Sequence, residues 1–409
     1  MNEVPDRQSL SPAPAPFTPD WPAIRARYAA AVRGTYLNLG SRGLLSESVH
    51  AAVTSRLAAE HEVVAGDIAE TTMKDETRAL FAKLIGATPE EIAFTRNVSE
   101  GLNAIATALP WQAGDNVVVS EELEHANNVY IWELLSQRFG IEVRVVAPDR
   151  GAIDAPAMAE AIDGRTRLVA ASAITFTPGF RTDLATIGAA ARAAGALLLV
   201  DGVQCLGVMR LDVEREMIDA LVTSTSKGMN GLRGQGFLYV RKEWITKLTP
   251  MSVARTAIAT GGHYSAFEGR KFAFRDDAQR FELGHLNYLG LTAAHAAMGE
   301  TLEVGVANIE RRVTALARRL AEGLAQQGWP VNRPPFPEAQ SHMVTVGARN
   351  LVGGPEATGD AKLDAFAAAL KAEGVDFTIR RGLLRFAFHM WNDESDVEHV
   401  LRIGAKLAG

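Results

Sequence analysis

One stretch of the sequence, residues 196–240, constrains the fold of this chain more than any other. It opens with an apolar run, residues 196–200, which predicts a buried strand, and Asp201 follows at its end. A second apolar run, residues 218–222, leads into a hydroxyl-rich segment that ends at Lys227 and is followed by four glycines. A carboxylate and an amine therefore each come directly after a buried strand, where open α/β sheets bind their ligands.

This pair of side chains suits the cofactor pyridoxal phosphate. The cofactor bonds covalently to a lysine amine, and a carboxylate beside its ring nitrogen keeps that nitrogen protonated, so that the ring accepts electrons. We therefore predict that Lys227 and Asp201 have these two roles. Taken alone, the lysine would be a solvated surface charge and the aspartate a turn residue, so the prediction rests on their combination.

The residues around this pair resemble the class V aminotransferase-fold enzymes. The segments VDGVQ and TSTSKGMNGLRGQGFLY are similar to the signature of that family, which includes cysteine desulfurases, isopenicillin N epimerases, kynureninases and several transaminases. The resemblance implies that Asp201 contacts the pyridine nitrogen, Gln204 the ring phenolate oxygen, Lys227 the C4′ carbon and Ser224 the phosphate. Ser226, which stands where the family often has histidine, is included among the cofactor-binding residues.

The order of predicted elements indicates an α/β protein. Strands alternate with helices through the first two thirds of the chain, which predicts a mostly parallel sheet. The resemblance implies the PLP-dependent transferase fold type I, with a large sheet domain and a small C-terminal α+β domain. We expect a proline-rich, disordered segment at residues 1–20 and a large cofactor-binding domain at 36–284. Residues 21–35 and 285–409 are expected to form the small domain.

Three further segments resemble cofactor-binding motifs of the family. RNVSEGLN opens a predicted helix, whose free N–H groups suit phosphate, and implies phosphate contacts from the backbone of Val98 and from Ser99. From the serine alone, Ser99 would be an N-cap. HANNVYIW resembles HxxNxxPW and implies that His125 stacks on the cofactor ring. RFELGHLN resembles RFExGTPN and implies a homodimer in which His285, in the threonine position, reaches the phosphate of the partner; alternatively, His285 only begins a helix.

The substrate-binding residues come from three other resemblances. GLLRFAFHMWN resembles RxSxxxYN, whose arginine holds the substrate carboxylate, and this implies that role for Arg385. A planar guanidinium suits the task, although Arg380 or Arg381 could share or replace it. Asn38 lies in TYLNLG, which resembles a turn near the substrate. Phe176 stands where the family often has an asparagine that contacts cofactor or substrate.

Composition excludes several other classes of protein. The net charge of −6 and the lack of a basic block argue against a nucleic-acid partner. The sequence contains no apolar run of 18 residues, so a membrane-spanning helix is not expected. The single cysteine, Cys205, excludes an intrachain disulfide and a cysteine-only metal site, and no metal-ligand spacing is present. The first residues do not resemble a signal peptide. We therefore expect a soluble, cytoplasmic protein without a metal.

The reaction is less constrained than the cofactor. Loss of the Cα proton of an amino acid can lead to transamination, epimerisation or elimination, with the same lysine acting as acid and base. Our first expectation is an aminotransferase that acts on an α-amino acid or related amine. The alternative is an isopenicillin N epimerase-like epimerase or a C–S/β-lyase, and a non-catalytic PLP-binding regulatory module ranks below both. A cysteine desulfurase is disfavoured, because no mobile-loop cysteine lies between Arg380 and Arg385.

Overall fold

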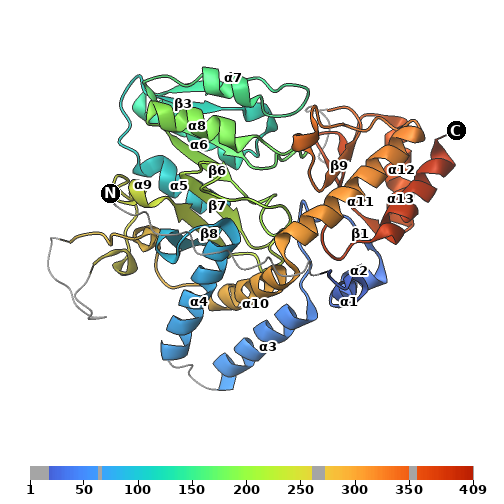
Figure 1. The fold of residues 1–409 in the computed structure, drawn as a ribbon, viewed down its shortest axis with the longest axis horizontal. Helices are drawn as coiled ribbons and strands as arrows, with labels where there is room; N and C mark the ends of the chain where they lie inside the picture. The colour runs from blue at the N-terminus through green and yellow to red at the C-terminus, as the bar shows by residue number, and fades with distance from the viewer. Residues whose placement is uncertain (1–17, 63–66, 260–271, 350–356, 409) are drawn as a thin grey trace, which may run out of the picture.

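The structure, a computed structural model, describes residues 18–62, 67–259, 272–349 and 357–408. The expectation of disorder for residues 1–17 lies outside the described residues. The chain forms a large sheet-containing part beside a smaller C-terminal part, with helix α11 (Val306–Gln326) running between them (Figure 1). The two parts together position the candidate site.

The large part is built on a seven-stranded sheet. The strand order is β2-β8-β7-β6-β5-β3-β4. Every neighbouring pair is parallel except the two pairs that contain β8. The predicted mostly parallel sheet is therefore confirmed. The strands are β2 (Ile92–Thr95), β3 (Asn116–Val119), β4 (Glu142–Val145), β5 (Thr166–Ser172), β6 (Leu197–Asp201), β7 (Ala220–Ser224) and β8 (Gly236–Val240).

Helices cover both faces of this sheet, because successive strand residues point to opposite faces. In β6, Leu197 and Leu199 belong to one buried cluster, which also contains side chains of α5 and α6. Leu198 and Val200 belong to the other cluster, together with side chains of α4, α7 and α8. The helices are α4 (Asp67–Ile85), α5 (Val98–Ala108), α6 (Asn127–Phe139), α7 (Ala155–Glu160) and α8 (Leu184–Ala194).

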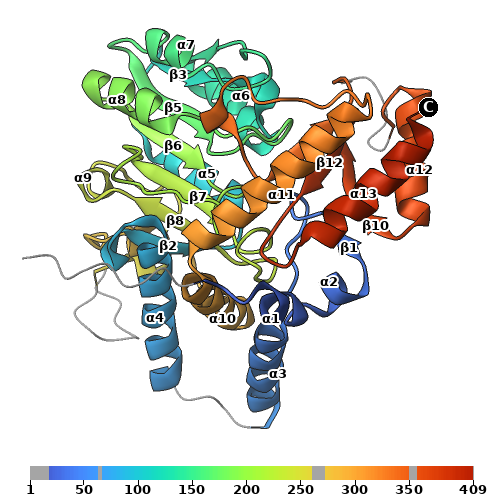
Figure 2. The same cartoon turned by 45° about the vertical axis from the view of Figure 1, so that its right-hand side comes forward.

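The C-terminal part packs helices on a small antiparallel sheet of order β11-β12-β9. Helices α11 and α13 lie side by side on it (Figure 2). A separate parallel pair, β1 with β10, joins the N-terminal region to this part. The elements are β1 (Thr35–Tyr36), β9 (Met343–Val346), β10 (Val375–Asp376), β11 (Thr378–Arg380), β12 (Leu383–Ala387), α12 (Ala361–Ala372) and α13 (Glu394–Leu407).

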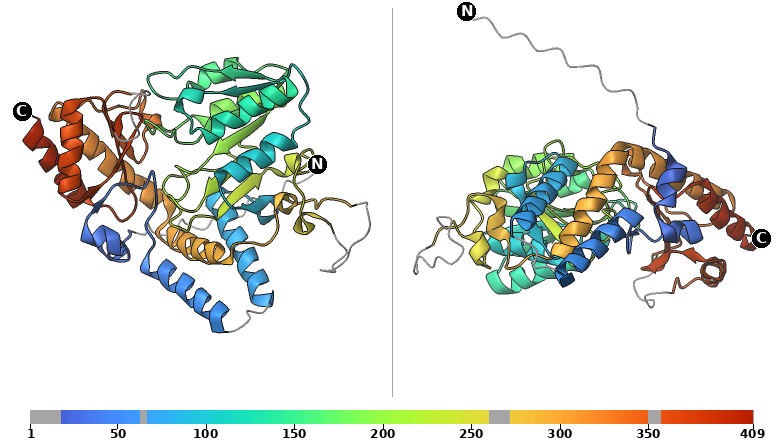
Figure 3. Two further views of the ribbon diagram at one scale, coloured as in Figure 1. Left: turned by 180° about the vertical axis from the view of Figure 1, so that it is seen from behind. Right: turned by 90° about the horizontal axis from the view of Figure 1, so that it is seen from below.

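The long helical region between the two parts is broken at Gly305. This residue has a φ of 81°, which favours glycine, and it separates α10 (Tyr288–Val304) from α11. Helix α10 packs against α4 and against α3 (Glu47–Glu62), below the large sheet (Figure 3, left). The shorter helices are α1 (Trp21–Ala26), α2 (Ala29–Arg33) and α9 (Lys242–Ile245). Within the described ranges, none of the helices combines the length and apolar character that crossing a membrane requires.

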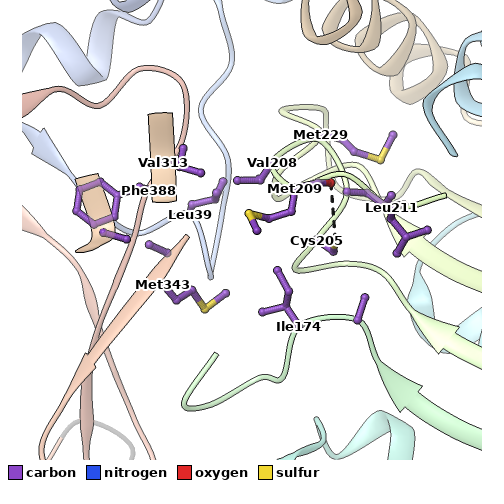
Figure 4. Close-up of a cluster of buried hydrophobic side chains, with 14 of the residues drawn as sticks. Leu39, Ile174, Cys205, Val208, Met209, Leu211, Met229, Val313, Met343 and Phe388 are labelled. Atoms are coloured by element: carbon purple, nitrogen blue, oxygen red, sulfur yellow. Dashed lines mark hydrogen bonds between the residues drawn. The ribbon is translucent and has the colours of Figure 1, made fainter. Parts of the chain in front are cut away.

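The boundary between the two parts is apolar. Val313, Met343 and Phe388 from the C-terminal side face Ile174 and Met209 from the large part (Figure 4). Cys205 lies in the same cluster, and its Sγ donates a weak hydrogen bond of 3.7 Å to the carbonyl oxygen of Met209. The sole cysteine of the chain is therefore part of the packed interior.

Candidate active site

Asp201 and Lys227 meet at one edge of the large sheet. Asp201 is the last residue of β6 and lies opposite Val222 of β7 in the parallel ladder, while Lys227 follows three residues after β7 ends. Asp201 is buried and accepts a hydrogen bond of 2.9 Å from the backbone N–H of Val203. The sequence prediction that a carboxylate and an amine share this edge is thus matched by the geometry.

Burial changes the pKa of Lys227 and the pKa of Asp201. Desolvation lowers the pKa of Lys227 to about 8, opposed by the charge of Asp201 and reinforced by Arg385 and Arg380. Desolvation also raises the pKa of Asp201, while the Val203 N–H and the charge of Lys227 act against it. The Lys227 amine makes no hydrogen bond with the part of the chain that the structure describes. A lysine amine with a lowered pKa and no fixed partner is suited to react as a nucleophile.

The two residues face a cavity of about 220 Å³. Eight of the predicted site residues line it: Val98, Ser99, His125, Phe176, Asp201, Gln204, Ser224 and Lys227. Asn97, Asn127, Ser172, Ile174 and Val203 complete the lining. The cavity therefore gathers residues from five segments that are far apart in the sequence.

One end of the cavity is the N-terminus of α5. Asn97 caps this helix by accepting a hydrogen bond of 3.0 Å from the N–H of Glu100, so the reading of Ser99 as an N-cap is wrong. The N–H groups of Val98 and Ser99 then have no partner among the described residues, and both residues line the cavity. The Ser99 hydroxyl accepts a hydrogen bond of 2.7 Å from Asn127. Free N–H groups at a helix start are suited to bind a phosphate.

His125 lies on the same cavity with a defined orientation. Its Nδ1 accepts a hydrogen bond of 3.2 Å from the N–H of Asn127, so in the neutral ring the proton is on Nε2. Desolvation lowers the pKa of His125, and the charges of Lys227, Arg381 and Arg385 add to this effect. The ring meets Phe176 edge-on, with centroids 5.2 Å apart at 84°. In its neutral form, His125 can thus donate a hydrogen bond from Nε2.

Gln204 and Ser224 add polar groups to the cavity wall. The Gln204 amide donates to the carbonyl oxygen of Gly40 at 3.0 Å, while its Oε1 is buried without a partner among the described residues. The hydroxyls of Ser224 and Ser226 lie 3.1 Å apart. The cavity therefore combines the unpaired Gln204 oxygen, the free N-terminus of α5, the Asp201 carboxylate and the Lys227 amine. These groups fit pyridoxal phosphate, which has polar groups at both ends and an aldehyde between them.

Arg385 is buried behind Phe176 rather than exposed on its strand. It donates to the carbonyl oxygen of Phe176 at 2.9 Å, and its guanidinium lies 5.1 Å from the Phe176 ring centroid. It forms no ion pair with any described residue, and desolvation lowers its pKa to about 9, with Arg380 contributing. A Cβ on Gly40 would lie 2.8 Å from the guanidinium carbon, so a larger residue there would displace the guanidinium. A buried guanidinium without a counter-ion is suited to bind a carboxylate.

Four of the predicted residues are not part of the cavity lining, namely Arg385, Asn38, Ser226 and His285. The Asn38 amide donates to Asp376 at 2.8 Å, and the Ser226 hydroxyl faces Ser224. His285 is exposed and contributes nothing to the cavity of its own chain. The sequence reasoning missed Asn97, although an asparagine three residues before a glutamate is a helix-start signal. It also missed the role of Asn127, which no local pattern indicates.

Comparisons with known proteins agree with this geometry. A probable cysteine desulfurase of Methanothermobacter thermautotrophicus is 33% identical over 251 residues, covering 61% of this chain and 61% of that protein. The chain spans about three fifths of the length of the curated relatives it first matches. The apo structure of a cysteine desulfurase from Thermococcus onnurineus NA1 is 26% identical with a TM-score of 0.80, covering 95% of this chain and 98% of that one. The complex of the cystine C–S lyase C-DES with its product cysteine persulfide is similar in fold, with a TM-score of 0.79, 23% identity and coverage of 93% and 99%.

These likenesses confirm the expected fold and cofactor. The solved relatives share the PLP-dependent fold type I, and one related structure carries a glycine covalently linked to its PLP cofactor. The resemblance found in the sequence segments around Asp201 and Lys227 is confirmed by a family description, Aminotransferase class-V, which matches residues 50–400. The chain belongs to the class V aminotransferase family, and it is an enzyme that depends on pyridoxal phosphate.

Proposed function

We propose that this enzyme cleaves the C–S bond of a cysteine derivative by β-elimination. The observation that carries this proposal is that Lys227 and His125 line one cavity, the first as a proton acceptor and the second as a hydrogen-bond donor. This pair suits β-elimination, because Lys227 can carry the Cα proton to the departing sulfur while the His125 Nε2–H stabilises the charge that develops on that sulfur. The names of the relatives, which include cysteine desulfurases, support a sulfur-containing amino acid as substrate.

Each of the site residues has a distinct role in this reaction. When bound, pyridoxal phosphate supplies an electron sink conjugated with Cα. Arg385 binds the substrate carboxylate and thereby orients the Cα–H bond, and the Lys227 amine accepts that proton. The ammonium that Lys227 forms on accepting the Cα proton can return this proton to the departing sulfur, while the His125 Nε2–H donates a hydrogen bond to the charge that develops on the sulfur. The Cβ–S bond breaks, the thiol leaves with one proton, and the remaining carbon skeleton takes up water and is released as pyruvate and ammonia.

The position of Cys205 distinguishes this proposal from a cysteine desulfurase that transfers sulfur to its own cysteine. Cys205 is the only cysteine of the chain, it is buried, and desolvation raises the pKa of its thiol to about 12. A thiol in this state is a poor nucleophile. The sulfur therefore leaves with the released product and is not stored on the protein.

Transamination, our first expectation from the sequence, is the second candidate. It is favoured by the family description and by the fact that Lys227 alone can move a proton between Cα and the cofactor. It requires an α-keto acid as the second substrate, whereas β-elimination does not. Epimerisation would instead convert the L-substrate to its D-form without releasing ammonia.

One assay separates these reactions. Purified holoenzyme is incubated with L-cystine, S-methyl-L-cysteine, L-cysteine and L-alanine, each with and without an added α-keto acid. Without keto acid, we expect equal amounts of pyruvate, ammonia and a sulfur product, which is cysteine persulfide from L-cystine, methanethiol from S-methyl-L-cysteine and sulfide from L-cysteine. None of these products should form with Lys227→Ala. Turnover of alanine that depends on the keto acid would overturn the proposal in favour of transamination, and a D-product would favour epimerisation.

We also propose a homodimer whose sites lie near the subunit interface. The exposed position of His285, away from the cavity of its own chain, supports the expectation that it reaches the partner's phosphate. The neutral or protonated imidazole can donate the hydrogen bond that the family's threonine supplies.

A further inference from the structure

Glu124 is a buried carboxyl group beside the cavity that none of the steps above uses. It directly precedes His125, and none of its surface is exposed. Its carboxylate accepts a hydrogen bond of 2.7 Å from the Ser172 N–H, a second from the Ser172 hydroxyl, and one of 3.0 Å from the Asn128 amide. It forms no ion pair within the described ranges. A buried charge without a cation is costly, so its presence beside a cofactor site requires an explanation.

The Glu124 carboxyl group lies close to Asp201. Ser172, which holds Glu124 by both its N–H and its hydroxyl, is the residue directly opposite Asp201 in the β5–β6 ladder. Desolvation raises the pKa of Glu124 to about 7, and the negative charge of Asp201 acts in the same direction, while the bonds from Ser172 and Asn128 oppose it. The charge of Asp201 therefore acts on Glu124, and Ser172, which contacts Glu124, lines the cavity together with Asp201.

Few positively charged groups neutralise the charge of these two carboxyl groups. Lys227 lies near Asp201 at the end of β7, but its amine becomes part of a covalent bond when the cofactor binds. Arg381 reaches Glu124 from the β11–β12 turn, where it donates to the main-chain carbonyl oxygen at 2.9 Å rather than to the carboxylate. His125, the next residue, has a lowered pKa and is neutral. A positive charge delivered into the cavity next to Asp201 would relieve the repulsion.

We propose that Glu124 is a positioning residue for the cofactor: it bears a second negative charge behind Asp201 and so stabilises the protonated ring nitrogen that Asp201 contacts. Binding of the ring-protonated cofactor and ionisation of Glu124 then favour each other, as any two coupled binding events do. Below neutral pH, cofactor binding releases the proton from Glu124. The inference rests on the predicted contact between Asp201 and the ring nitrogen and is independent of the reaction that follows.

The surroundings of Glu124 accommodate both of its protonation states. The ionised form accepts the three hydrogen bonds described above. In the protonated form, the carboxyl proton can be donated to the Ser172 hydroxyl oxygen, or to the Asn128 Oδ1, which is buried without a partner among the described residues and is interchangeable with the amide nitrogen by a flip. A glutamine at position 124 can make the same contacts, so Glu124→Gln removes the charge while keeping the shape.

The experiment measures binding of pyridoxine 5′-phosphate to the apo-protein from pH 5 to 8.5. This probe has the ring nitrogen and the phosphate but no aldehyde, so the reaction with Lys227 does not contribute. The titration of the probe's phosphate affects wild type and variant equally and cancels in the ratio of their dissociation constants. We expect Glu124→Gln to bind as wild type at pH 5 and roughly tenfold more weakly at pH 8, which corresponds to a coupling of about one pKa unit.

Controls separate this inference from the assignment of Asp201. Glu121→Gln removes the same formal charge from the same segment without touching Ser172 or Asn128 and should leave binding unchanged. Asp201→Asn should weaken binding at least as much as Glu124→Gln. If Asp201→Asn has no effect, the predicted ring-nitrogen contact is wrong; if Asp201→Asn weakens binding but Glu124→Gln does not, only the role of Glu124 is wrong.

A purely structural role of Glu124 predicts a different pattern. A ratio of dissociation constants that is the same at every pH would overturn the proposal. Should Glu124→Gln fail to fold, Ser172→Ala carries the test, because it removes one donor from the carboxylate and keeps its charge. That variant should shift the pH midpoint of binding upward without a loss at high pH, and an unchanged midpoint would contradict the role.

Discussion

Arg385 is tied to Phe176 by a hydrogen bond of 2.9 Å from its guanidinium to the Phe176 carbonyl oxygen. This contact joins β12 of the C-terminal part to the loop after β5 in the large part. Phe176 in turn contacts the ring of His125 edge-on, so the candidate carboxylate-binding residue and the candidate hydrogen-bond donor to the departing sulfur share one neighbour. A change at any of the three residues is therefore expected to affect substrate orientation.

Covalent attachment of the cofactor should occur at Lys227. After borohydride reduction of the holoenzyme, peptide mapping should find the pyridoxyl group on this residue, because its amine lines the cavity with a lowered pKa. Lys227→Ala should carry no label, whereas Lys242→Ala, at the start of α9, should be labelled as wild type. A label on another lysine would show that the assignment is wrong.

The rate of that attachment should depend on pH around the lowered pKa of Lys227. Only the free amine attacks an aldehyde, so the rate should rise with pH and level off above about 8. Asp201 raises the pKa of Lys227, so Asp201→Asn should move the midpoint to lower pH. Stopped-flow absorbance of apo-protein mixed with cofactor measures both curves, and a midpoint near that of an ordinary lysine would contradict the prediction.

Arg385→Lys should reduce kcat/KM for amino acids by roughly 2 kcal/mol or more, on the scale of a charged hydrogen bond. The guanidinium fork fixes both the position and the rotation of a carboxylate, which a lysine amine cannot do. Amines without a carboxylate should be unaffected, and Arg319→Lys at an exposed ion pair is the matched control. If the variant turns over both substrate types as wild type does, the carboxylate is bound elsewhere, and Arg380 or Arg381 becomes the candidate.

Cys205→Ala should retain full turnover, because a buried thiol with a raised pKa does not accept sulfur. We expect the free energy of unfolding to fall by about 1 kcal/mol, the usual size for a small core truncation. Cys205→Ser should unfold more easily still, since it places a hydroxyl in an apolar cluster. Sulfide release and thermal unfolding measure the two effects, and loss of turnover in a folded Cys205→Ala would restore the cysteine desulfurase reading.

The active protein should be a homodimer, and His285→Ala should weaken cofactor binding without changing the fold. Light scattering gives the oligomeric state, and fluorescence titration gives the dissociation constant. His50→Ala, on α3, serves as a control of the same residue type. A monomer that is fully active at nanomolar concentration would contradict the proposed interface role.

The sequence predicted the sheet and the pair of Asp201 and Lys227 because both depend on local patterns. Short apolar runs mark the strands, and the functional groups directly follow them. The parallel pair of β1 with β10, by contrast, joins segments about 340 residues apart, and no local pattern encodes such a pairing. The same holds for Glu124, whose importance depends on the register that places Ser172 opposite Asp201.

Burial was the other quantity that the sequence did not reveal. An arginine on a strand is usually exposed, yet Arg385 is almost completely buried. All five residues of its strand are buried, and the loop at Gly40, which contacts its guanidinium, lies far away in the sequence. The family resemblance indicated a role for Arg385, but the absence of a counter-ion became visible only in three dimensions.

The apolar boundary between the two parts of the molecule is rich in thioether side chains, including Met209, Met229 and Met343 (Figure 4). Methionine is unbranched and flexible, so it refills space when its neighbours shift. We therefore expect this seam to tolerate small displacements of β9 and α11 relative to the large part better than a seam of branched side chains would. Because β12 pairs with β9, such a displacement would also move Arg385 relative to Lys227.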